Sequence, residues 1–142
     1  MTVSHILVPY DGQKDAERAF DEAVKICKKY SCKLSLVTCF DESDQKFNLA
    51  FFALKEFDTH FAHIITEKIK ILESEVKKES VSFSHHFIKS KWIVQELISF
   101  ASKNNVDMII AGSSKPGEFK KLFLGSVSEE LQNNAKCIVK IV

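Results

Sequence analysis

The chain has 142 residues, of which 45% are hydrophobic and 27% charged, and its formal net charge is +1. This length fits one domain, so we expect residues 1–142 to form a single domain whose core needs no disulfide or metal. Acidic and basic residues are interspersed, which argues against nucleic acid as a partner. No apolar run reaches the roughly 18 residues of a membrane span, and the start lacks signal-peptide features. We therefore expect a cytoplasmic protein without a membrane partner.

The first half of the chain alternates short apolar runs with amphipathic segments. Residues 6–10 form an apolar run that ends at the turn signal Asp11-Gly12, which predicts a buried strand. Apolar residues at a 3.6-residue period predict a helix over residues 16–27. Residues 34–40 are rich in β-favouring side chains and predict a second strand. The polar residues 41–46 are typical of a loop.

The longest periodic segment runs from this loop to about Lys78 and predicts a long helix. The residues expected on its apolar face are Phe57, Phe61, Ile64, Ile65, Ile69, Leu72 and Val76. Residues 81–88 alternate in polarity, which predicts a strand nearer the sheet edge. Further on, patterns predict a helix over 93–101, a buried strand over 108–112, a helix over 126–135 and a strand over 137–142.

Strands that alternate with helices in this way predict a parallel sheet covered on both faces. The fold class expected is a Rossmann-like three-layer α/β/α sandwich with five parallel strands. In the common strand order 3-2-1-4-5, a ligand crevice lies beyond the carboxyl ends of strands one and four. Asp11 and Gly112 follow these two strands and are expected at the edges of the crevice.

The segment from Gly112 to Glu129 follows a predicted strand and opens a predicted helix. A helix start offers free backbone N–H groups to an anion, and Gly125 would let the backbone approach a phosphate. Lys115, Lys120 and Lys121 add positive charge nearby. The alternative is plain capping, because Ser126 and Glu129 have the spacing of a capping box.

The spacing of Gly112, Gly125 and Ser126 resembles the C-terminal signature of the universal stress protein family. In that signature, glycine, two residues, glycine, nine residues and a third glycine precede serine or threonine. Residues 6–12 resemble the family's first strand and its aspartate, and residues 105–112 and 137–142 resemble its fourth and last strands. The match covers essentially the whole chain. It implies the 3-2-1-4-5 sheet and a homodimer that pairs through the C-terminal strand.

The resemblance also implies ATP or AMP binding by a stress-response regulator, with Mg²⁺ as a candidate companion ion. Asp11 and the backbone near Cys39 would hold the nucleoside, and Gly112 would lie by the ribose. Gly125, Ser126 and the two following residues would hold the phosphates. The nucleotide-binding residues implied are Pro9, Tyr10, Asp11, Cys39, Gly112, Lys115, Gly117, Gly125, Ser126, Val127 and Ser128.

The sequence departs from the family at the middle glycine of the signature, which is Lys115, followed by Pro116 and Gly117. Proline restricts Lys115 to extended geometry and removes one N–H, which could abolish nucleotide binding. That outcome would leave a dimeric scaffold or regulator of the same fold. Alternatively, Gly117 gives the loop its freedom and the Lys115 ammonium pairs with phosphate. No catalytic set is evident, and at most Asp11 beside a nucleotide would allow slow ATP hydrolysis.

Other candidate residues carry weaker signals. The four cysteines lack zinc-site spacing and are expected to be free, mostly buried thiols; the alternative is a redox pair of Cys27 and Cys32. His85 and His86 point to opposite faces of a strand and cannot share a metal. Trp92 is expected to pack. No metal site is predicted.

Overall fold

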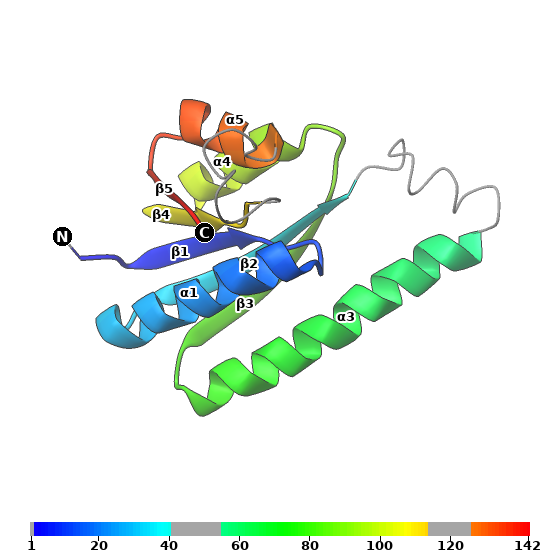
Figure 1. The fold of residues 1–142 in the computed structure, drawn as a ribbon, viewed down its shortest axis with the longest axis horizontal. Coiled ribbons are helices and arrows are strands. Elements are labelled where there is room, and N and C mark those ends of the chain that lie inside the picture. The colour runs from blue at the N-terminus through cyan, green and yellow to red at the C-terminus, as the bar shows by residue number, and fades with distance from the viewer. Residues whose placement is uncertain (1, 41–54, 114–125) are drawn as a thin grey trace.

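The computed structural model describes residues 2–40, 55–113 and 126–142 (Figure 1). The elements are β1 His5–Pro9, α1 Lys14–Tyr30, β2 Lys33–Phe40, α3 Lys55–Lys78, β3 Ser82–Lys89, α4 Ile93–Lys103, β4 Met108–Ala111, α5 Ser126–Asn134 and β5 Ile138–Ile141. Each predicted strand and helix is present within these ranges, with shifts of a few residues at the ends. The predicted loop at 41–46, and the first part of the long periodic segment, lie outside the described residues.

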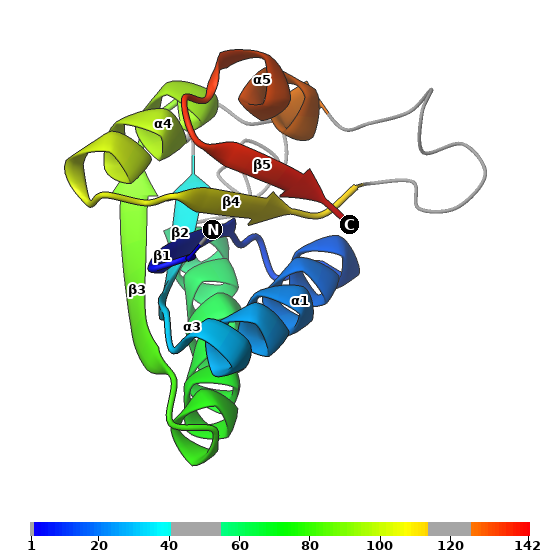
Figure 2. The same cartoon turned by 90° about the vertical axis from the view of Figure 1, so that its left-hand side faces the viewer.

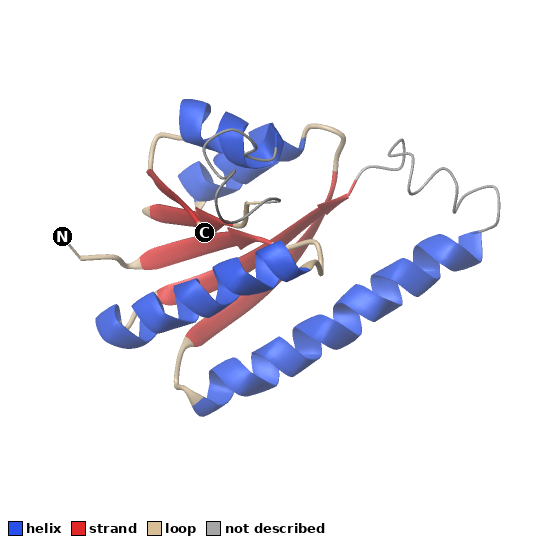
Figure 3. Ribbon diagram, viewed as in Figure 1, coloured by secondary structure: helices blue, strands red, loops and turns tan. Residues whose placement is uncertain are grey.

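The strands form one sheet in the order β3-β2-β1-β4-β5, and every pair is parallel. Figure 3 shows these strands in red between the helices in blue. β1 lies at the centre, where Ile6 pairs with Leu34 on one side and with Met108 on the other. β3 and β5 lie at the two edges. The predicted strand order is therefore confirmed.

Two helices cover each face of the sheet (Figures 1 and 2). Alternation along β1 divides its side chains between the faces, as strand geometry requires. Ile6 and Val8 pack with buried residues of α1 and α3, whereas Leu7 packs with those of α4 and α5. These two apolar clusters sandwich the sheet and confirm the predicted three-layer architecture.

The turns that lead from α1, α3 and α4 into the next strand share one geometry. Ser31, Ser80 and Asn105 have φ values of 55°, 59° and 55°, in the left-handed region. The residue after each donates its N–H to a carbonyl five residues earlier, as from Cys32 to Cys27 at 3.2 Å. This is the Schellman ending of a helix, in which glycine is the usual left-handed residue.

Two side chains that were predicted to pack, Ile64 and Trp92, are exposed instead. Ile65, Ile69, Leu72 and Val76 of α3 are buried, but Ile64 is 41% exposed because it lies one helical residue off that face. The side chains of Phe57 and Phe61 lie outside the described residues. Trp92 does not pack into the core: it is 58% exposed, and the Lys91 ammonium lies 5.2 Å from its ring centroid.

The amino ends of β1 and β4 are tied together by Asp107. Its carboxylate accepts hydrogen bonds from the Ser4 N–H and hydroxyl at 2.8 and 2.6 Å, and from the His5 N–H at 3.3 Å. Burial alone would raise the pKa of Asp107, but these hydrogen bonds outweigh it and hold that pKa below its ordinary value.

A chain of hydrogen bonds also crosses β1, β2 and β3 beneath α4. His5 Nδ1 lies 2.9 Å from the Asn104 carbonyl oxygen, and its Nε2 lies 2.8 Å from Ser35 Oγ. Ser35 Oγ lies 2.8 Å from Ser84 Oγ, which in turn lies 3.2 Å from His86 Nε2. The chain satisfies polar groups that an apolar sheet face would otherwise leave unpaired.

The four cysteines are free, with Cys27 and Cys32 buried and the other two half-buried, as predicted. Burial raises the pKa of the Cys39 thiol to about 11, and that of Cys27 still further. Within the described ranges, no group of three His, Cys, Asp or Glu side chains could hold a metal ion. None of the helices described is long and apolar enough to cross a membrane.

Candidate functional site

A cavity of about 290 Å³ lies beyond the carboxyl ends of β1 and β4. This is the crevice predicted from the strand order, where the chain leaves the sheet in opposite directions from adjacent strands. The residues lining it are Pro9, Tyr10, Asp11, Asp15, Ala16, Val37, Cys39, Ile93, Leu97, Ala111, Gly112, Val127 and Ser128. Acidic side chains stand on the β1 side, and glycine and serine stand on the β4 side.

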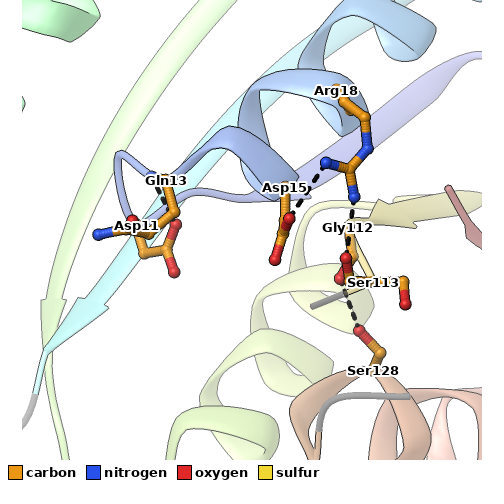
Figure 4. A network of polar contacts seen from close by, with 7 residues as sticks. All are labelled: Asp11, Gln13, Asp15, Arg18, Gly112, Ser113 and Ser128. Carbon is orange, nitrogen blue, oxygen red and sulfur yellow. Dashed lines mark hydrogen bonds and ion pairs between the residues drawn. The ribbon is translucent and has the colours of Figure 1, made fainter. Parts of the chain in front are cut away.

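The turn after β1 presents Asp11 at the cavity. Asp11 Oδ1 accepts a hydrogen bond from the Gln13 N–H at 2.9 Å, which fixes the turn into α1 (Figure 4). Gly12 adopts a φ of 80°, and its carbonyl accepts a bond from Lys68 Nζ of α3 at 2.8 Å. The Asp11 side chain remains exposed at the cavity, where its charge is available to a ligand.

Gly112 lies against the first turn of α1. A Cβ atom at this position would stand 2.1 Å from the Asp15 carbonyl oxygen and 2.8 Å from the Asp15 Cβ. No side chain fits at that distance from backbone, so glycine is required here for the close approach of β4 to α1. The packing of two elements explains Gly112, independently of any ligand.

Gly112 and Ser113 are held by hydrogen bonds from three elements. The Ser128 hydroxyl of α5 donates to the Gly112 carbonyl at 3.0 Å, and Arg18 Nη2 of α1 donates to the Ser113 carbonyl at 2.9 Å (Figure 4). The Ser113 N–H donates to the carbonyl of Val142 at 2.8 Å. The β4 side of the cavity is thereby a fixed wall.

Tyr10 lines the cavity and carries an unusual, buried hydroxyl. Its side chain is 3% exposed, and among the described residues its Oη is the buried side-chain oxygen or nitrogen without a hydrogen-bond partner. Burial, followed by the charges of Glu17 and Asp11, raises the pKa of Tyr10 to about 12. The hydroxyl therefore stays protonated and can donate at neutral pH.

One part of the cavity surface is apolar. Val37 and Cys39 of β2, which lies on the far side of β1 from β4, and Ile93 and Leu97 of α4 form this apolar surface. Such a surface suits a flat, weakly polar group, while a carboxylate can accept hydrogen bonds from hydroxyls. The start of α5 supplies backbone N–H groups that favour an anion.

Seven of the residues predicted for binding come together here. Those that line the cavity are Pro9, Tyr10, Asp11, Cys39, Gly112, Val127 and Ser128. Ser126 begins α5, while Lys115, Gly117 and Gly125 lie outside the described residues. The capping box of Ser126 and Glu129 cannot be placed for the same reason, because the Ser126 side chain is not described.

Sequence reasoning missed the remaining lining residues. They are Asp15, Ala16, Val37, Ile93, Leu97 and Ala111. The apolar members looked like ordinary core residues. Asp15 had one signal, because an acid and an arginine three residues apart on a helix can pair, but only the fold brings that pair to Gly112.

Comparisons with known proteins agree with this fold. A model of the universal stress protein family matches residues 2–142. A Staphylococcus aureus strain USA300 protein named as a universal stress protein is 29% identical over 143 residues, covering 100% of this chain and 85% of that protein.

Solved structures give the same result. Universal stress protein UspA from Lactobacillus plantarum has a TM-score of 0.80 at 20% identity, covering 100% of this chain and 99% of that one. A universal stress protein in complex with cAMP has a TM-score of 0.70 at 18% identity, covering 100% and 98%. The chain belongs to the universal stress protein family.

Proposed function

We propose that this protein binds an adenine nucleotide, ATP or AMP, in the cavity between β1 and β4 and acts as a stress-response regulator. The observation that carries the proposal is the polarity of the cavity. An apolar surface on the β2 side, the Asp11 carboxylate after β1 and the start of α5 beside Gly112 suit, in turn, the base, the ribose hydroxyls and the phosphates of one nucleotide. The bound nucleotide would set the conformation of the protein or its choice of partner.

Each part of a nucleotide has a matching group. The Asp11 carboxylate accepts hydrogen bonds from ribose hydroxyls, and the base lies on Val37, Ile93 and Leu97. The phosphates lie toward Val127 at the start of α5, where the helix dipole favours negative charge. The related structure solved with cAMP supports a nucleotide as the ligand class for this fold.

The second candidate is a scaffold or regulator that has lost nucleotide binding. Lys115 stands where the family signature has its middle glycine, and the Asp15 carboxylate lines the cavity near the proposed phosphate path. In both versions we propose a homodimer that pairs through β5. β5 is an edge strand whose Ile138 is 40% exposed, and a two-fold partner strand would satisfy its open backbone groups.

Calorimetric titration with ATP, AMP and adenosine tests the proposal. We expect the parent to bind all three, and Gly125→Val to lose ATP while retaining adenosine, because a β-branched side chain would fill the phosphate path. Ser102→Val, on the exposed surface of α4, is the control for an added β-branched residue. Light scattering on the same samples reports the dimer.

A parent that binds none of the three ligands, and releases no adenine nucleotide on denaturation, would leave the scaffold as the function. Equal loss of ATP and adenosine in Gly125→Val would instead place the phosphates elsewhere.

A further inference from the structure

Arg18 is the single arginine of the chain, and it joins two groups at the cavity. Its Nη1 lies 3.1 Å from Asp15 Oδ1, and its Nη2 donates to the Ser113 carbonyl at 2.9 Å (Figure 4). The two nitrogens of one planar guanidinium thus hold a side chain of α1 and the backbone that follows β4. A guanidinium can make two such bonds at fixed geometry, whereas an ammonium acts as a point charge.

The first partner, Asp15, places a negative charge where the proposed ligand is also negative. Asp15 lines the cavity, and its backbone lies in close contact with Gly112. A carboxylate without a counter-charge would repel a phosphate across the cavity, and partial exposure of the carboxylate leaves this repulsion open to screening by salt. Arg18 supplies that counter-charge from outside the cavity, with about a third of each side chain exposed.

The second partner, Ser113, is buried and directly follows Gly112, which lines the cavity. Gly112 is held by α5 through Ser128, and Ser113 by Val142, the residue after β5. Arg18 adds the connection to α1. Contacts with α1 on one side, and with α5 and Val142 on the other, therefore set the distance between the acidic edge of the cavity and Gly112.

We infer that Arg18 is a positioning residue for an anionic ligand of this cavity: it compensates the charge of Asp15 and, through the Ser113 carbonyl, fixes the neighbouring Gly112, which lines the cavity. This role rests on the proposed function. The inference deepens that function, because Arg18 would affect binding of the nucleotide's phosphates and not binding of its nucleoside part. Arg18 touches neither directly, so its effect passes through its two partners.

The experiment compares ATP with adenosine by calorimetry in the parent, Arg18→Gln, Arg18→Lys, Asp15→Asn and the double variant Asp15→Asn with Arg18→Gln. In Arg18→Gln we expect ATP to bind about tenfold more weakly and adenosine to change less than about twofold, since only ATP meets the exposed carboxylate charge. High salt should reduce the ATP deficit.

The other variants separate charge from position. Arg18→Lys should recover part of the ATP affinity, because it restores the charge without the second hydrogen bond. The double variant should bind ATP to within about threefold of the parent, because position 15 then carries no uncompensated carboxylate. Lys25→Gln, which removes an exposed positive charge from the same helix, is the matched control and should leave ATP binding unchanged.

Two outcomes would overturn the role of Arg18 while leaving the proposed function intact. One is unchanged ATP affinity in Arg18→Gln. The other is an equal loss of ATP and adenosine that Asp15→Asn does not relieve, which would mean that Arg18 only maintains the fold. A parent that binds neither ATP nor adenosine would overturn the proposed function and, with it, this inference.

Discussion

The two ends of the sheet use polar residues in opposite ways. At the amino end, Ser4 and His5 both donate to the Asp107 carboxylate, and the His5 ring reaches the Asn104 carbonyl. At the carboxyl end, Asp11 faces a cavity and the Tyr10 hydroxyl is buried without a described partner.

The contrast separates stability from recognition. Polar groups that bond within the protein stabilise the sheet, whereas groups left at a cavity are available to a ligand. Changes at the amino end should therefore alter unfolding without altering ligand binding, and Asp11 should do the reverse. Gly112 is the exception, because it lies at the cavity yet is required by packing.

Gly112→Ala should have the largest effect, and it tests the one residue at the cavity that packing requires. Because the new Cβ would overlap the Asp15 carbonyl, we expect the free energy of unfolding to fall by about 3 kcal/mol. Urea denaturation measures the change. Gly12→Ala is the control: its Cβ would have 3.5 Å to the nearest atom but a φ of 80°, so it should cost only about 1 kcal/mol. Equal losses in the two variants would contradict the steric explanation.

Asp107→Ala and Asp11→Asn form a pair that tests the contrast directly. Asp107→Ala should lower the free energy of unfolding by about 2 kcal/mol, because three hydrogen bonds lose their acceptor, and should leave adenosine affinity unchanged. The lowered pKa of Asp107 means that its contribution is present above about pH 3.8 and is lost as the pH falls through its lowered pKa.

Asp11→Asn should do the opposite. Asparagine keeps an acceptor for the Gln13 N–H, so the unfolding free energy should change by less than about 0.5 kcal/mol. Adenosine affinity should fall about tenfold, because the charged acceptor for ribose is lost. A stability change in Asp11→Asn without a change in affinity would show that the two ends do not differ in this way.

Ser31→Gly should give the smallest change in stability. Ser31 lies in the turn from α1 into β2, at the amino end of the sheet. Glycine adopts the left-handed conformation of Ser31 without a Cβ penalty, so thermal unfolding should report a gain of about 0.5 kcal/mol. Ser31→Ala removes the hydroxyl but keeps the Cβ, and it should show no gain. Adenosine affinity should be the same in all three proteins.

The sequence was sufficient to predict the fold and the place of the cavity. Apolar runs at a period near two or 3.6 determine the elements, and the alternation of strands and helices determines the parallel sheet. Asp11 and Gly112 could be placed at opposite edges of the crevice, because each follows a strand whose position in the sheet was predicted.

Contacts between side chains of different elements could not be predicted in this way. Nothing in the local pattern of Asp15 or Arg18 indicates that the first turn of α1 meets Gly112, since that contact joins residues nearly 100 positions apart. Ile64 shows the same limit on a smaller scale, because two adjacent isoleucines on a helix cannot both face one sheet. Trp92 is exposed although its size suits a core.

The hydrogen-bonded chain under α4 also determines where its protons lie. The Asn104 carbonyl can only accept, so the N–H at His5 Nδ1 donates to it, and in this tautomer of the neutral ring Nε2 accepts from Ser35. Ser35 then accepts from Ser84, and Ser84 accepts from His86. All four bonds point the same way, so their dipoles add along the line from His86 to Asn104.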